Sequence, residues 1–192
     1  MTQLLDKPTD QRIVIHGTCE QFNLMKQASQ DSPGVKLFFY EGTIEIVMPG
    51  FQHENFSEII GYLVTTFLLS QGIAFVPSGS VTQECEGKAS AQADKSYCLG
   101  SAKPIPDLSI EVIFTSGSTN KLARYQALGV SEVWFWEDGV LTLYHLRENC
   151  YVRIERSELP GIQQLDVDLL RRCILMAETD FRSAVQTFQA SI

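Results

Sequence analysis

The sequence predicts an α/β (α+β) fold in which a mixed β-sheet with a βαβ crossover is flanked by helices. The crossover is the first of three supporting observations. Residues 107–115 are rich in Ile and Val and predict a strand, residues 121–128 predict a helix that ends at Gly129, and residues 133–136 predict a second strand. A strand, a helix and a strand within about thirty residues form a crossover, which pairs the two strands in parallel beneath the helix.

The other two observations are a hairpin and an amphipathic helix. Two apolar runs flank Glu41-Gly42 and predict a hairpin of residues 35–40 and 43–48. Further along, apolar residues recur at intervals of three and four, which indicates the buried face of a helix beginning near Asn55. These apolar residues are Phe56, Ile59, Ile60, Leu63, Val64, Phe67 and Leu68.

The remaining elements complete a single expected domain over residues 1–192. Thr18 and Gln21 have the spacing of a capping box, which predicts a short helix over residues 19–29. We expect further strands at residues 73–76, 97–99, 141–146 and 151–154, and two helices after Asp166. The expected parts are an N-terminal helix and hairpin (about 18–50), a core (about 51–160) and C-terminal helices (about 165–190), all around one mixed sheet.

Length and charge restrict the function classes. The chain has 192 residues, 44% of them hydrophobic, and a formal net charge of −8 with a sequence pI of about 4.9. Such a charge argues against a protein that coats DNA or an anionic membrane, because neutralising phosphates requires clustered Lys and Arg. It leaves room for an enzyme that meets a phosphodiester in one local groove with a metal ion supplying positive charge.

Cysteine and histidine spacing argues for a cytoplasmic protein without a zinc site. The five cysteines are widely spaced and form no CxxC pair, which is typical of free thiols in a reducing compartment. The three histidines are scattered as well. The N-terminus lacks the basic start and apolar segment of a signal peptide, and no eighteen apolar residues run together.

Glu111 is the most informative single residue. It is the only charged side chain between Leu108 and Thr115, in a strand that is otherwise apolar or small. A central strand covered by helices is buried on both faces, where an unpaired carboxylate costs several kcal/mol. One interpretation is structural, with Glu111 in a salt bridge or at an edge position that faces water. The other is functional, with Glu111 in a metal-binding or catalytic role. The glycine- and serine-rich turn that follows the strand favours the functional interpretation.

A second metal ligand must come from a neighbouring strand. Asp107 is on the same face of the strand as Glu111, but about 13 Å away, too far to share one ion. Asp94, just before the expected strand at residues 97–99, is the natural candidate. Alternatively, Asp94 is a solvated loop carboxylate and Asp107 a residue at the start of its strand.

Two further charged residues are candidates. Lys121 stands in the first turn of the crossover helix, where it can reach the end of the Glu111 strand, the place where ligands gather in open α/β sheets. Glu54 could reach the site from the start of the preceding helix as an outer ligand. Alternatively, Lys121 is a surface lysine, and Glu54 is a first-turn acid favoured by the helix dipole. The sequence contains neither a P-loop nor a GxSxG elbow.

Several segments of the chain together form a recognisable pattern. They are Pro106-Asp107-Leu108-Ser109-Ile110-Glu111-Val112-Ile113, Thr115-Ser116-Gly117, Lys121-Leu122 with Tyr125, Leu128-Gly129-Val130 with Glu132-Val133-Trp134, the acidic hairpin of residues 42–49 before His53-Glu54, and the tail of residues 165–170. In these segments nearly the whole chain, about residues 35 to 190, resembles the Uma-type family of restriction-endonuclease-like proteins. This family is abundant in cyanobacteria and is similar to the PD-(D/E)xK nuclease superfamily.

The resemblance implies a restriction-endonuclease-like core with a metal-dependent phosphodiesterase site. The first aspartate of the superfamily maps onto Asp94 and the acidic strand residue onto Glu111, so these two would hold Mg²⁺ or Mn²⁺. The usual strand lysine is replaced by Ile113, and Lys121 would take its place. Ala93 and Lys95 also depart from the first motif of the family.

The sequence therefore predicts an endonuclease that hydrolyses phosphodiester bonds of nucleic acid, DNA in the first instance. The catalytic residues would be Asp94, Glu111 and Lys121, and a homodimer would suit an enzyme that cuts both strands. The alternative is a catalytically weakened or inactive module of the same fold that binds nucleic acid or a protein partner.

Overall fold

A six-stranded mixed sheet forms the centre of the computed structural model, which describes the chain apart from residues 1–9, 31, 33, 80–81, 86 and 115–117. Its strand order is β11-β10-β9-β8-β7-β4. The strands are β4 (Phe75–Pro77), β7 (Lys95–Leu99), β8 (Leu108–Ile113), β9 (Glu132–Glu137), β10 (Val140–Leu146) and β11 (Tyr151–Ile154). β8 and β9 pair in parallel, as the crossover pattern predicted, and the other described pairs in this sheet are antiparallel.

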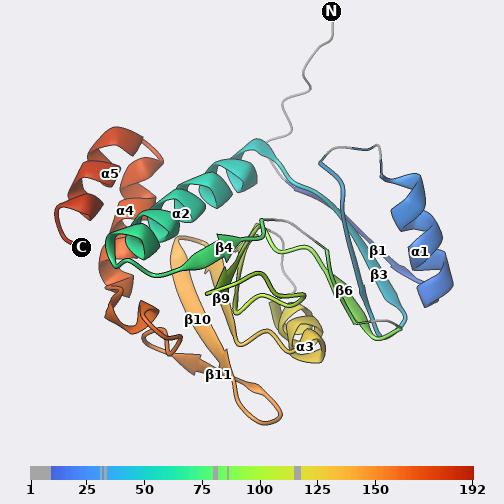
Figure 1. The fold of residues 1–192 in the computed structure, drawn as a ribbon. Helices are drawn as coiled ribbons and strands as arrows, with labels where there is room; N and C mark the ends of the chain where they lie inside the picture. Colours follow the sequence, from blue (N-terminus) through green and yellow to red (C-terminus); the bar gives the residue numbers. More distant parts are fainter. Residues whose placement is uncertain (1–9, 31, 33, 80–81, 86, 115–117) are drawn as a thin grey trace, which may run out of the picture.

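A second, antiparallel sheet of five strands lies beside the first (Figure 1). Its order is β1-β3-β2-β6-β5, with β1 (Gln11–His16), β2 (Lys36–Tyr40), β3 (Thr43–Met48), β5 (Gln83–Cys85) and β6 (Ala89–Ala91). The predicted hairpin is confirmed as β2 and β3. The expectation of one mixed sheet is wrong, because β1 extends the hairpin on one side and the two three-residue strands β5 and β6 extend it on the other.

Within the described residues, five α-helices cover the sheets. They are α1 (Cys19–Ala28), α2 (Phe51–Ser70), α3 (Ser118–Leu128), α4 (Val167–Ala177) and α5 (Phe181–Gln189), with a short 3₁₀ turn at Ile162–Gln164. The predicted capping box is present, since the Gln21 amide donates to the Thr18 side chain and the Thr18 amide donates to the Gln21 side chain. The α2 helix begins at Phe51, four residues before the predicted start, with Gly50 as its N-cap.

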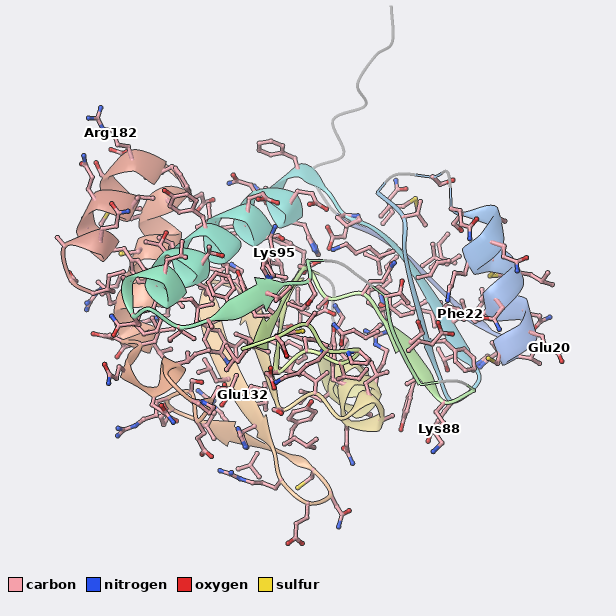
Figure 2. The ribbon with its side chains drawn as sticks, in the orientation of Figure 1. Glu20, Phe22, Lys88, Lys95, Glu132 and Arg182 are labelled. Carbon is pink, nitrogen blue, oxygen red and sulfur yellow. The ribbon has the colours of Figure 1, made fainter. Side chains whose placement is uncertain are left out.

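The apolar residues form three cores, which divide the molecule into layers (Figure 1). The largest core lies between one face of the six-stranded sheet and α2, α4 and α5. The second lies between the opposite face of that sheet, α3 and the five-stranded sheet. The third joins α1 to the outer face of the five-stranded sheet around Phe22 (Figure 2). All six residues of β8 are buried as a consequence of this double cover.

A buried glutamate fixes the loop that follows β11. Glu132 in β9 is fully buried (Figure 2), and its carboxylate accepts hydrogen bonds from Trp134 Nε1 at 3.0 Å, Ser157 Oγ at 2.8 Å and the Glu158 amide at 2.6 Å. His145 Nδ1 lies 3.0 Å from the same carboxylate. Glu132 therefore satisfies several buried donors at once and ties the loop to the sheet.

No helix in the described part of the chain is long and apolar enough to cross a membrane. Four of the five cysteines, Cys19, Cys98, Cys150 and Cys173, are free thiols in the structure. Cys150 is exposed and the other three are at least partly covered.

Candidate functional site

Charged residues collect where the two sheets meet, a region we call the seam. Only residues 92–94 separate β6 in the five-stranded sheet from β7 in the six-stranded sheet, so the chain passes directly from one sheet to the other. The α3 helix contacts β5 and β6 and also packs on the six-stranded sheet. The seam is therefore bounded by both sheets, by α3 and by the N-terminal end of α2.

Asp94 lies at this junction with almost no solvent contact. Its Oδ2 accepts a hydrogen bond from the Val112 amide of β8 at 2.6 Å. Its Oδ1 accepts a hydrogen bond from His53 Nε2 at 2.9 Å and is ion-paired with Lys36. Burial alone would raise the pKa of Asp94, but the His53 hydrogen bond and the Lys36 charge outweigh burial and hold this pKa well below its usual range. Asp94 is therefore an ionised carboxylate in a protein interior.

His53 joins Asp94 to a second carboxylate. Its Nδ1 lies 2.8 Å from Asp10 Oδ2, and the other oxygen of Asp10 accepts the Gly50 amide at 2.9 Å. Burial would lower the pKa of His53, but the hydrogen bonds to Asp10 and Asp94 and the charges of both raise it to about 9. His53 is thus an imidazolium at neutral pH, which donates from both ring nitrogens.

Glu111 faces the seam from β8 and is held by α3. Tyr125 donates a hydrogen bond to its Oε1, and the Lys121 ammonium lies 3.6 Å from its Oε2. Burial and the nearby Glu111 charge raise the pKa of Tyr125 well above its usual value, so this phenol remains a donor. The buried strand carboxylate therefore has the partners that its position requires.

The structure places Asp94 next to the Glu111 position of β8, with Lys121 beside Glu111. Lys95 is paired with Ile110, so the preceding residue Asp94 runs alongside the Glu111 end of β8. Two hydrogen bonds confirm the contact, since the Asp94 amide donates to the Ile110 carbonyl at 3.1 Å and the Asp94 side chain binds the Val112 amide. Side chains at such adjacent strand positions lie within reach of one another.

A further carboxylate, Glu45 in β3, extends the charged cluster. Its carboxylate accepts hydrogen bonds from Arg12 Nε at 2.6 Å and from Arg124 Nη1 at 3.2 Å. The Arg124 guanidinium also lies 4.0 Å from the centre of the Phe38 ring. Burial would raise the pKa of Glu45, but the charge of Arg124 and the Arg12 hydrogen bond, with a contribution from Lys121, lower it.

An open cleft gives access to the Asp94 end of the cluster. Its volume is about 530 Å³, within the range of ligand sites. The charged residues lining it are Lys36, Glu54, Glu58, Asp94 and Lys95. Three acids against two lysines leave this cleft without a surplus of positive charge. A larger groove of about 880 Å³ lies beyond Glu58 and Lys95 along α2, but it does not reach the buried carboxylates.

The secondary candidates lie in different places. Glu54 is exposed at the cleft, where its charge acts on Lys36. The described partners of Asp107, the other secondary candidate, lie outside the cluster. Its carboxylate accepts the Leu99 amide at 2.7 Å and pairs with Lys103 at 2.6 Å, so it closes the loop between β7 and β8.

Sequence analysis did not identify Lys36, His53 or Tyr125 as part of the site. His53 could have been found, because it stands three residues before Phe56 and so extends the apolar face of the helix by one turn. Glu54, which the sequence predicted as an outer ligand, is exposed to solvent. Lys36 gave no comparable signal, because its partner Asp94 is 58 residues away.

The model of the Uma2 family, described as "Putative restriction endonuclease", matches residues 19–173 of the 192 residues. The chain belongs to this family. The Uma2 match includes Lys36, His53, Asp94, Glu111 and Lys121, whereas Asp10 lies before it. A comparison with curated proteins found no match.

The donor set of this Uma2 chain fits Mg²⁺ or Mn²⁺ chemically. No group of three or more His, Cys, Asp or Glu side chains is arranged around a common point within the described residues. Two adjacent carboxylates are nevertheless what Mg²⁺ commonly takes from a protein, since water and substrate phosphate supply the other ligands. Asp94 Oδ2 has one hydrogen bond, and the described partner of Glu111 Oε2 is the Lys121 ammonium at 3.6 Å.

The imidazolium of His53 predicts a pH-dependent stability. Its pKa is about 9 in the folded protein and about 6.5 when unfolded, so its contribution is complete below pH 6.5 and is lost as pH rises through 9. We expect the free energy of unfolding to fall by about 2–3 kcal/mol over this interval. Urea denaturation at several pH values measures this loss.

The control for this experiment is a second histidine. His53→Gln should flatten the pH profile, whereas His16→Gln, at an exposed position on β1, should leave it as in the wild type. A wild-type profile that stays level between pH 6.5 and 9 would show that His53 is neutral.

Proposed function

We propose that this Uma2 protein is a metal-dependent endonuclease that hydrolyses phosphodiester bonds of DNA. The proposal is supported by two buried carboxylates, Asp94 and Glu111, at neighbouring positions of adjacent chain segments, and by Lys121 of the crossover helix beside Glu111. Membership of the Uma2 family supports a nuclease, and the carboxylate pair supports the metal.

Asp94 and Glu111 would hold Mg²⁺ or Mn²⁺. The bound ion supplies positive charge that polarises the phosphate and lowers the pKa of bound water. Positive charge from an ion also suits a cleft with no cationic surplus of its own. The Val112 amide and the Tyr125 hydroxyl orient the two carboxylates, so the directions of both side chains are set before an ion binds.

Lys121 would act on the reacting phosphate. Its ammonium is largely buried next to Glu111, in a position from which it can stabilise the negative charge that develops in the transition state. Glu54, at the cleft, would complete the outer part of the site. A homodimer, which sedimentation equilibrium would detect, would present two such sites to the two strands of DNA.

The test is cleavage of supercoiled plasmid by the full-length protein. We expect cleavage in millimolar Mn²⁺ or Mg²⁺ but not in EDTA, and a steep fall in rate as salt rises from about 50 to 200 mM. The reason is that binding must rest on local lysine and arginine contacts to phosphate, each of which adds about one unit to the salt slope, because a protein of net charge −8 lacks long-range attraction to phosphate.

Two lysine variants sharpen this prediction. Lys121→Ala should lose about 10²-fold in rate because it removes charge from the reacting centre. Lys103→Ala removes the same charge at Asp107, outside the cluster, and should cut nearly as well as the wild type. Metal-independent cleavage, a salt-insensitive rate, or equal losses for the two variants would contradict the mechanism.

A second candidate function rests on one specific observation. Asp94 already accepts three hydrogen bonds, two of them from cationic side chains, which is also what a purely structural carboxylate requires. A non-catalytic module would leave plasmid intact at every metal concentration. A module that binds nucleic acid would in addition shift plasmid in a gel-shift assay, whereas one that binds a protein partner would not.

A further inference from the structure

Lys36 stands in a place that the proposed metal ion also needs. Its ammonium is ion-paired with Asp94 Oδ1, and the charges of Glu111 and Glu54 act on the same ammonium. One lysine from the five-stranded sheet is therefore surrounded by the carboxylates that would bind the ion. A compact ammonium and a divalent cation compete for the same oxygens, because both are bound by negative charge.

The Asp94 carboxylate already accepts several hydrogen bonds, so a metal ion and Lys36 compete directly for its oxygens. Oδ1 accepts from both His53 and Lys36, and Oδ2 accepts the Val112 amide. A carboxylate oxygen has about two acceptor directions, so only one direction on Oδ2 stays open. A metal ion held by Asp94 while Lys36 stays in place would stand beside two positive side chains. Withdrawal of Lys36 removes one of these charges and frees a direction on Oδ1.

Lys36 lines the open cleft, whereas His53 and Lys121 do not. It is the first residue of β2, and its side chain lines the open cleft with 14% of its surface exposed. Glu54 and Glu58 on the same cleft offer alternative partners. His53, by contrast, is fixed between two carboxylates, and Lys121 is largely buried against Glu111.

We propose that Lys36 is a resident counter-ion of the carboxylate pair, which must leave Asp94 before a divalent cation binds and so sets the metal affinity of the site. The inference rests on the proposed metal-dependent function and adds a regulatory residue to it. When Lys36 is on Asp94, the pair is neutralised without metal and the fold is stable. When Lys36 turns into the cleft, the pair becomes a metal site, and the displaced ammonium lies where a phosphate would enter.

The experiment measures the binding of Mn²⁺ alone to the full-length protein, by the loss of the electron paramagnetic resonance signal of free Mn²⁺. Lys36→Met keeps the apolar stem and removes the charge, and we expect it to bind Mn²⁺ at least about tenfold more tightly than the wild type. Lys95→Met is the matched control, because it removes the same charge from the same cleft. Lys95 pairs with Glu58 and has no hydrogen bond to Asp94, so its affinity should stay within about twofold of the wild type.

Two more variants complete the design. Lys36→Met combined with Asp94→Asn should lose the gain, which shows that the effect passes through Asp94. Lys36→Gln, which keeps a hydrogen-bond donor without the charge, carries the same expectation if Lys36→Met does not fold. Circular dichroism of each variant reports folding independently of metal.

The outcomes separate the two proposals. If wild type binds Mn²⁺ and the Lys36 variants bind it equally or more weakly, the counter-ion role is wrong and the metal-dependent function stands. An equal gain in Lys95→Met would also overturn the inference, because a general change in charge would then explain it. If neither the wild type nor any Lys36 variant binds Mn²⁺, both proposals fail.

Discussion

Replacing Glu111 with glutamine is expected to lower metal-dependent plasmid cleavage by about 10³-fold or more. The amide is almost the same size and can still accept the Tyr125 hydrogen bond, so the strand and α3 should stay in place. It removes the charge that would hold the metal and the ion pair with Lys121. The measurement is the rate of nicking in saturating Mn²⁺.

The matched control is Asp107→Asn, which neutralises a carboxylate just before the same strand but outside the cluster. It should cut at a rate close to that of the wild type. Cleavage by Glu111→Gln at the wild-type rate would remove Glu111 from the mechanism and, with it, the proposed metal site.

The largest expected effect on stability is at Glu132. Glu132→Ala would leave Trp134 Nε1, Ser157 Oγ and the Glu158 amide without their acceptor in a buried place. Breaking a buried network of this kind costs about 3–5 kcal/mol of unfolding free energy. Urea denaturation at pH 7 measures the loss.

The control is Glu158→Ala, since Glu158 is a partner of Arg147 at the surface. Its side chain is well solvated, so its removal should change the urea midpoint little. A Glu132→Ala midpoint as close to the wild type as that of the control would mean that water replaces the lost acceptor.

Elements with a strong periodic pattern were predictable from the sequence. The crossover of β8, α3 and β9, the β2–β3 hairpin and α2 each carry six or more residues in a repeating pattern or a clear turn signal. The strands β5 and β6 were not, because each has three residues, and a pattern of period two needs a longer run to be recognised. Because β5 and β6 were not predicted, the hairpin was assigned to the mixed sheet and the second sheet was missed.

The site divides in the same way. Glu111 was predictable because a charge in an apolar strand is locally visible, and Asp94 and Lys121 followed from their distance to that strand and from the family motif. Lys36 and His53 were not, because their partnership with Asp94 is created by docking of the two sheets and of α2. The local sequence around a charged residue does not indicate which distant charged residue will contact it in the fold.

Because the cluster lies in the seam, it forms only when distant parts of the chain have come together. Lys36 and Asp94 are 58 residues apart, and Glu45 and Arg124 are 79 residues apart, so these contacts close long loops. A chain emerging from the ribosome carries the basic side chains of the first sheet well before the strand that bears Glu111. Until both sheets have closed on α3, these charges are apart and the proposed cutting centre cannot form. An enzyme built in this way would be harmless to nucleic acid while incomplete, and any opening between the sheets would switch it off.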